Sequence, residues 1–178
     1  YDRFEKDFVW LVRAGVALKT DRVTEPKPPL RGTQRPSSFK LYQSDTGMLL
    51  ARFPSRLAGE IYLDERKSNV GGVFENVVAQ EIVAAGFRPY YYLSKKVGEV
   101  DFLIESDEGV VAIEVKSGSD YLTHASLTKV METKGYDVAR GIVLCRANFK
   151  ERDGILYAPW YATLCLEGLN TGGDFFLK

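Results

Sequence analysis

Two charged residues stand in the apolar, strand-like segment 110–116 (VVAIEVK). Successive side chains of a strand point to opposite faces, so Glu114 and Lys116 share one face with Ala112, while the alternate apolar residues line the other face. Charges are costly to bury unless they are paired or bound to a metal ion. Glu114 and Lys116 are therefore candidate site residues rather than ordinary strand residues.

Asp101 lies in the preceding strand-like segment, 97–105, and the turn between the two segments decides whether Asp101 reaches the same face. A two-residue loop at Glu108–Gly109 would place Asp101 opposite Lys116, with Glu114 diagonally adjacent. A three-residue loop would turn Asp101 to the other face unless a bulge compensated. We expect the two-residue loop.

Two carboxylates and an ammonium on one face suit phosphodiester hydrolysis. The oxygens of Asp101 and Glu114 are hard ligands for Mg²⁺ or Mn²⁺, and a bound ion lowers the pKa of a coordinated water. Lys116 is expected to position that water or to stabilise the developing negative charge.

Glu75 is the fourth candidate site residue and the third candidate metal ligand. It shares a helical stripe with Val78 and Ile82 in the segment 72–85, at the border of the face expected to pack on a sheet. A glutamate in the first turn also stabilises a helix N-terminus through the helix dipole, so this second role stays open for Glu75.

The elements that must position these residues follow one another in the order α-β-β-β-α-β. They are a helix at 72–85, strands at 90–94, 97–105 and 110–116, a helix at 126–134 and a strand at 141–145. This order predicts an α/β fold in which helices flank a mixed sheet, with at least one crossover helix. Residues 71–178 are expected to form this core domain.

Residues 1–70 are expected to be an N-terminal helical and loop extension that packs on the core. Apolar spacing predicts an amphipathic helix at 2–14, and the prolines of 24–38 predict a loop without regular structure. A short strand is expected at 39–42, followed by a helix at 45–53 with Asp45 as its cap.

The segments 98–104 (GEVDFLI) and 113–118 (IEVKSG) resemble the signature of the PD-(D/E)XK nucleases, the restriction-endonuclease-like superfamily, whose core has the same element order. Val100 stands where that signature usually has a proline. A narrower resemblance, to the uncharacterised C-terminal domain of bacterial and archaeal AAA-type ATPases, spans nearly the whole chain. It adds the segments 39–42 (FKLY), 45–47 (DTG) and 72–76 (GVFEN).

This resemblance implies either a metal-dependent nuclease acting on DNA or RNA, or a catalytically inactive nuclease-fold module that binds nucleic acid or protein and regulates an attached ATPase. It also implies an ATPase domain on the N-terminal side, which agrees with a chain that starts at Tyr1 without a methionine. A second copy of the chain is a further candidate partner. A solvent-reachable pocket that holds all four candidate residues would favour the nuclease, and a covered, saturated cluster of ion pairs would favour the module.

The composition is that of an ordinary globular protein, with 45% hydrophobic and 27% charged residues. No apolar run approaches the roughly 18 residues of a membrane helix, so we expect a cytoplasmic protein without a membrane partner. The 24 basic residues equal the 24 acidic ones, which counts against a dedicated nucleic-acid binder. Cys145 and Cys165 lie in apolar runs and are expected to be buried, and with a single histidine they do not form a zinc site.

The letters of the motif recur at Asp120, Glu132 and Lys134. Glu132 and Lys134 fall in a predicted helix, where residues two apart do not share a face, so the strand context selects the site at Asp101. His124 follows a polar connection and is expected on a surface loop outside the site.

Overall fold

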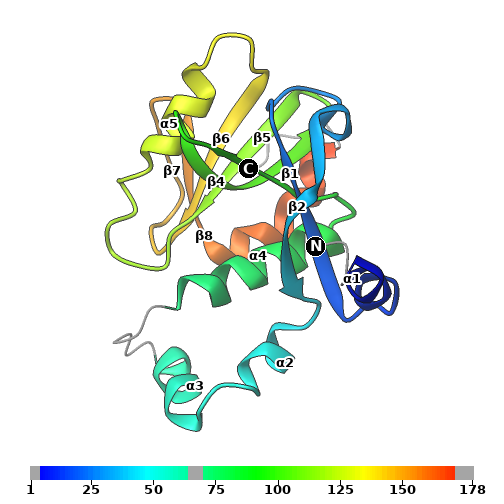
Figure 1. Ribbon diagram of the computed structural model, residues 1–178. Coiled ribbons are helices and arrows are strands. Elements are labelled where there is room, and N and C mark those ends of the chain that lie inside the picture. The colour runs from blue at the N-terminus through cyan, green and yellow to red at the C-terminus, as the bar shows by residue number, and fades with distance from the viewer. Residues whose placement is uncertain (1–4, 64–69, 171–178) are drawn as a thin grey trace.

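An eight-stranded mixed β-sheet is the centre of the computed structural model, which describes residues 5–63 and 70–170 (Figure 1). Its order is β2-β1-β3-β4-β5-β6-β8-β7. The strands are β1 (Ala17–Val23), β2 (Gln34–Gln43), β3 (Tyr90–Ser94), β4 (Gly98–Ser106), β5 (Gly109–Val115), β6 (Val138–Cys145), β7 (Lys150–Arg152) and β8 (Ile155–Pro159). The helices are α1 (Glu5–Arg13), α2 (Thr46–Leu50), α3 (Ser55–Tyr62), α4 (Gly71–Ala84) and α5 (Ala125–Glu132), with 3₁₀ segments η1 (Leu30–Thr33) and η2 (Trp160–Asn170). The predicted α/β class is confirmed.

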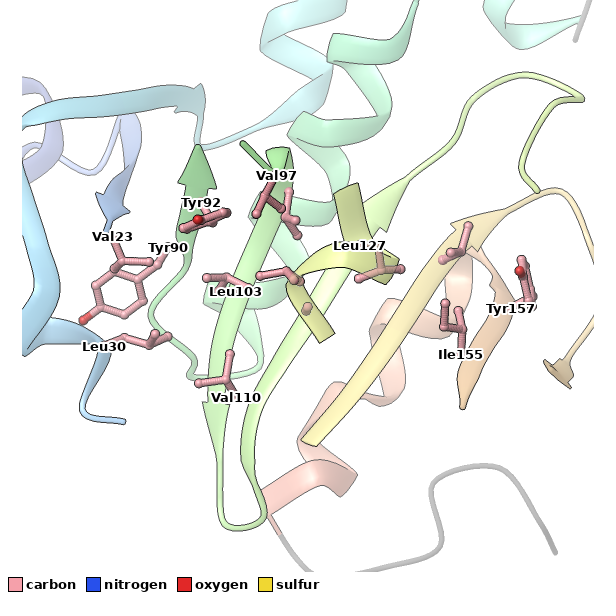
Figure 2. Close-up of a cluster of buried hydrophobic side chains, with 14 of the residues drawn as sticks. Val23, Leu30, Tyr90, Tyr92, Val97, Leu103, Val110, Leu127, Ile155 and Tyr157 are labelled. Carbon is pink, nitrogen blue, oxygen red and sulfur yellow. The ribbon is translucent and has the colours of Figure 1, made fainter. Parts of the chain in front are cut away.

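Helices cover both faces of the sheet and create two hydrophobic cores (Figure 1). The α5-side core joins α5 to β3, β4, β5 and β6, and Figure 2 shows Leu127 of α5 among its side chains. The α4-side core joins α4 and η2 to the opposite face. Along β5, Val111 and Ile113 belong to the α4-side core and Ala112 to the α5-side core, so the predicted alternation of this strand is confirmed.

The predicted α-β-β-β-α-β core corresponds to α4, β3, β4, β5, α5 and β6, with ends that differ from the expectation by a few residues. In the described part of the chain, no helix is long and apolar enough to cross a membrane.

The N-terminal part of the chain contributes strands to the same sheet. β1 pairs antiparallel with β2 and parallel with β3, so the sheet continues from the first 43 residues into the core. The strand predicted at 39–42 is confirmed and is longer than expected, because β2 starts at Gln34. The prediction of an irregular 24–38 segment is therefore wrong for residues 34–38. Pro36 is tolerated there because β2 is an edge strand and its pairing with β1 is irregular at this point, where the partner changes from Phe39 to Arg35.

The two helices predicted in the N-terminal part can also be compared with the structure. The Asp45 carboxylate accepts a hydrogen bond from the Met48 N–H at 3.1 Å, which confirms the cap, although α2 ends at Leu50. Helix α1 is described from Glu5 to Arg13, and residues 2–4 of the predicted helix lie outside the described residues.

Cys145 is buried as expected, whereas Cys165 is exposed, so that prediction was wrong. In η2 the residues that turn toward the sheet are Ala162, Thr163 and Leu166, whereas Cys165 faces outward.

Candidate active site

The β4–β5 hairpin closes with a two-residue loop, but not at the predicted residues. Ser106 pairs with Gly109, so the loop is Asp107–Glu108 and the predicted loop at Glu108–Gly109 was wrong by one residue. Gly109 starts β5 with a φ of +130°, a conformation that side-chain-bearing residues rarely adopt, and its carbonyl accepts a hydrogen bond from the Ser106 hydroxyl at 3.0 Å. These two features fix the loop one residue earlier.

The corrected register keeps the loop even. The β4–β5 ladder ends at the pair of Phe102 with Ile113, so Asp101 lies one residue beyond the last pair and is not opposite Lys116. Because the pairing moves by two residues, the predicted parity of the hairpin is unchanged.

A β-bulge lies beside Asp101 on the other edge of β4. Tyr90 pairs with Leu103 and Tyr92 pairs with Val100, so β3 advances two residues while β4 advances three. The extra residue belongs to the Val100–Leu103 stretch of β4, which contains Asp101. Bulges commonly re-aim a side chain next to a functional site.

The Asp101 carboxylate is held by the backbone of β5. Its Oδ2 atom accepts a hydrogen bond from the Val115 N–H at 2.8 Å. The next amide along the strand, that of Lys116, donates instead to Leu144 of β6. Asp101 therefore serves β5 as an acceptor where a backbone carbonyl of β4 would otherwise be needed, and its orientation is fixed.

Glu114 is buried, with 8% of its surface exposed. Its Oε1 atom forms an ion pair with the Lys116 ammonium at 2.9 Å, as expected for residues two apart on one strand face. Its Oε2 atom is buried and has no hydrogen-bond partner among the described residues. An unpartnered buried carboxylate oxygen is unfavourable for folding and is chemically available to a ligand.

Glu75 of α4 contacts two residues of β2, Tyr42 and Lys40, and Lys40 connects it to the charged residues of β4. We call Glu75, Glu99, Asp101, Glu114, Lys40 and Lys116 the cluster. The Tyr42 hydroxyl donates a hydrogen bond to Glu75 Oε2 at 2.9 Å, and the Lys40 ammonium lies 3.4 Å from the same atom. Lys40 also forms a closer ion pair with Glu99 of β4. The sequence prediction missed Lys40, Tyr42 and Glu99, and the available signal was a lysine and a tyrosine two apart in the strand candidate 39–42.

The carboxylates influence one another strongly. Burial and the nearby charge of Glu114 raise the pKa of Asp101 from 3.8 to about 7, and the charge of Glu75 adds to the increase. The Val115 N–H and the Lys40 ammonium oppose the increase without cancelling it. Asp101 therefore changes its protonation state near neutral pH.

Burial also affects the two residues of β2. It lowers the pKa of Lys40, but the hydrogen bond with Glu99 and the charge of Glu75 outweigh burial, so the net change is upward. Burial and the charge of Glu75 raise the pKa of Tyr42. Lys40 is thus a permanent cation and Tyr42 a permanent hydrogen-bond donor.

The cluster is neither fully covered nor saturated with ion pairs. The side chains of Glu75 and Lys116 are each 27% exposed, so solvent reaches the cluster, and one oxygen of Glu114 is unpartnered. An apolar pocket of about 540 Å³, whose lining includes Tyr42, is formed elsewhere, and none of the four predicted site residues lines it.

The fit of a metal ion depends on how many carboxylates converge. Among the described residues, no three Asp, Glu, His or Cys side chains are grouped so that they could hold a metal ion. Mg²⁺ commonly uses one or two protein carboxylates and completes its coordination with water and substrate phosphate. Asp101 and Glu114 match that smaller ligand set, whereas Glu75 is engaged by Tyr42 and Lys40.

Two residues that the sequence placed outside the site have other roles. His124 lies in the connection before α5, as expected, but it is half-buried there. Its Nε2 atom lies 2.6 Å from the Tyr157 hydroxyl and its Nδ1 atom 3.2 Å from the Thr128 hydroxyl. Of the second motif match, Glu132 ends α5 and Lys134 lies beyond it.

A family model described as "Domain of unknown function (DUF4143)" matches residues 70–162, just over half of the chain. No curated protein and no solved structure matches the chain. The matched region contains Glu75, Glu99, Asp101, Glu114 and Lys116, while Lys40 and Tyr42 lie outside it.

Proposed function

The chain belongs to the DUF4143 family, and from this premise we propose that the cluster on β4 and β5 is the active site of a metal-dependent phosphodiesterase of the PD-(D/E)XK type that hydrolyses DNA or RNA. The observation that carries the proposal is the unpartnered, buried Oε2 atom of Glu114 beside Asp101 and Lys116. A buried carboxylate oxygen without a hydrogen-bond partner destabilises the fold, so its presence favours a ligand that binds to this atom.

The arrangement of the chain's own groups supports this chemistry. The Val115 N–H orients Asp101, and the Lys116 ammonium holds Glu114, so the two carboxylates are positioned before a ligand arrives. Asp101 and Glu114 would hold one Mg²⁺ or Mn²⁺ ion, which supplies Lewis-acid activation of water and phosphate when bound. Lys116, partly exposed beside Glu114, would stabilise negative charge that develops on the phosphate.

The ion pairs of the cluster favour a second candidate function. Lys116 pairs with Glu114, and Lys40 pairs with Glu75 and Glu99, as charged residues do in a structural cluster of ion pairs. Such a cluster would belong to a catalytically inactive module that binds nucleic acid or protein and regulates an attached ATPase.

The partners follow from the same proposal. The resemblance of the sequence to the C-terminal domain of AAA-type ATPases supports an ATPase domain in the full-length protein as one partner. DNA or RNA is the substrate of the nuclease, and a second copy of the chain is the remaining candidate.

The decisive experiment measures cleavage of DNA and RNA in Mg²⁺ and in Mn²⁺, with the ATPase portion attached. Lys116→Ala is expected to lower the cleavage rate by about 100-fold or more, the usual effect of removing a group that stabilises the transition state. Lys129→Ala, which removes an exposed lysine of α5, is the matched control and should cleave at the wild-type rate.

The opposite result identifies the second candidate function. If the wild-type protein cleaves neither nucleic acid, the nuclease proposal fails. The inactive module predicts that Asp101→Ala and Lys116→Ala change the melting temperature and leave nucleic-acid or protein binding intact.

A further inference from the structure

The Lys40 ammonium lies between two carboxylates, a place where a metal ion could otherwise bind. Its ammonium lies between Glu75 of α4 and Glu99 of β4, 3.4 Å from the first and in a closer ion pair with the second. The ammonium also lies 5.4 Å from the centre of the Tyr91 ring, and the lysine side chain is only 24% exposed. Lys40 is therefore a built-in component of the cluster rather than a mobile surface lysine.

The remaining contacts of Glu75 keep it on the Lys40 side. The Tyr42 hydroxyl donates to the same Glu75 oxygen that faces Lys40, so this oxygen already has two donors. The unpartnered oxygen belongs instead to Glu114, beside Asp101. The four carboxylates thus form two pairs. Glu75 and Glu99 contact Lys40, whereas Glu114, beside Asp101, contacts Lys116.

The charges of the cluster match one divalent ion. Four carboxylates and two ammonium groups leave two negative charges when all six are ionised. The carboxylates are those of Glu75, Glu99, Asp101 and Glu114, and the ammonium groups are those of Lys40 and Lys116. One Mg²⁺ neutralises this excess, whereas a second ion would leave two surplus positive charges in a partly buried site, a surplus that the loss of the Lys40 charge would halve.

We propose that Lys40 is an internal cation that fills the place beside Glu75 and Glu99, so that the site takes one divalent ion instead of the two used by many phosphodiester-cleaving enzymes. The inference rests on the proposed function, because it takes Asp101 and Glu114 as the ligands of the single ion. Lys40 is a positioning residue in this arrangement, since it holds Glu75 and Glu99 and touches neither proposed metal ligand directly.

The test counts Mn²⁺ ions bound per chain, by calorimetry and by electron paramagnetic resonance, on the full chain at about pH 8, where Asp101 is ionised. The wild-type protein is expected to bind one ion and Lys40→Met two. Lys40→Arg keeps the positive charge and should bind one ion. Lys129→Met removes an exposed lysine and should also bind one, which controls for the general loss of a positive charge.

The difference between Lys40→Met and the wild type tests the inference, and the wild-type value tests the proposed function. A gain of one ion in Lys40→Met supports the role of Lys40 even if the wild type binds none, a result that would remove the proposed metal site. The inference is overturned if a folded Lys40→Met protein binds no more ions than the wild type, or if the wild type binds two ions. In either case, the proposed metal-dependent nuclease still holds as long as the wild type binds an ion.

Glu99→Gln provides a second variant in case Lys40→Met does not fold. Glu99 is 42% exposed, and it belongs to the pair that faces Lys40. Its removal should leave one bound ion and weaken Mn²⁺ affinity by less than about tenfold. A loss of about tenfold or more, the loss typical of a group that supports a bound metal, would overturn the division of the carboxylates.

Discussion

The protonation state of Asp101 affects both the stability of the fold and the proposed binding of a metal ion. The Asp101 carboxylate accepts the Val115 N–H, and burial together with the nearby charges of Glu114 and Glu75 raises its pKa to about 7. The folded protein therefore holds this proton more tightly than the unfolded chain, where the ordinary value is 3.8. Below about pH 7, a cation that binds to Asp101 must therefore displace this proton.

Asp101→Asn should make the protein more stable above neutral pH. Because the folded state binds the proton more tightly, the free energy of unfolding of the wild type falls as the pH rises from about 4 to about 7. Asparagine keeps an oxygen that accepts the Val115 N–H and removes the charge. Urea unfolding across this range should show a variant that matches the wild type near pH 4 and exceeds it at about pH 8.

The comparison at low pH is the internal control for that experiment. A difference between the two proteins that stays constant across the range would contradict the raised pKa of Asp101. Adding Mg²⁺ at about pH 8 should stabilise the wild type and have a smaller effect on the asparagine variant, if Asp101 is a ligand.

At the residue scale, the sequence allowed the prediction of Asp101, Glu114 and Lys116 because charged residues in an alternating apolar strand are locally visible. Lys40 and Glu99 could not be paired in the same way. Their contact depends on the order of strands in the sheet, and no spacing along the chain encodes that order.

At the scale of elements, Gly98 determines how closely β4 approaches α5. Its φ is +106°, and a Cβ atom at this position would lie 2.3 Å from the Ser126 hydroxyl oxygen. Any other residue would therefore be strained, and the Ser126 hydroxyl would have to move, because the Ser126 Cβ atom would also lie only 3.3 Å away.

Gly98→Ala is expected to destabilise the protein by about 1–3 kcal/mol, from backbone strain and overpacking. Gly59→Ala is the matched control, because Gly59 lies inside α3 with an ordinary φ and no atom within 4 Å of an added Cβ. That control should stabilise the protein by about 0.5–1 kcal/mol. Chemical denaturation measures both, and equal effects of the two substitutions would contradict the close approach at Gly98.

The strand β1 shows why some elements escaped prediction, as α3, β7 and β8 also did. Its sequence, ALKTDRV, has no apolar alternation and contains three charged residues. Asp21 is buried in it, with ion pairs to Lys19 at 2.7 Å and to Arg88 at 3.0 Å. Tertiary partners on both sides therefore make this segment a strand, whereas α4 and β5 have patterns that suffice locally.

For the whole molecule, the sheet is continuous across the boundary between the first 43 residues and the matched family region. β1 covers the edge of β3, whose Tyr90, Tyr91 and Tyr92 are all buried. Without β1, this aromatic strand would be an exposed edge, which favours aggregation.

Two truncations test this dependence. A chain that starts at Ser44 loses β1 and β2 and is expected to lose its cooperative thermal transition or to aggregate. A chain that starts at Val16 loses α1 and keeps both strands, so it should retain a cooperative thermal transition. Normal cooperative unfolding of the shorter fragment would show that the core folds independently of the N-terminal strands.

The contact between Lys40 and the two glutamates has a consequence for transplanting this domain. The stretch 70–162 contains all four acidic residues of the cluster and Lys116, whereas Lys40 lies outside it on β2. If that stretch were fused to another protein, the cluster would lack one positive charge, and the other protein would have to supply it. The portable unit is therefore larger than the portion recognisable by its sequence pattern.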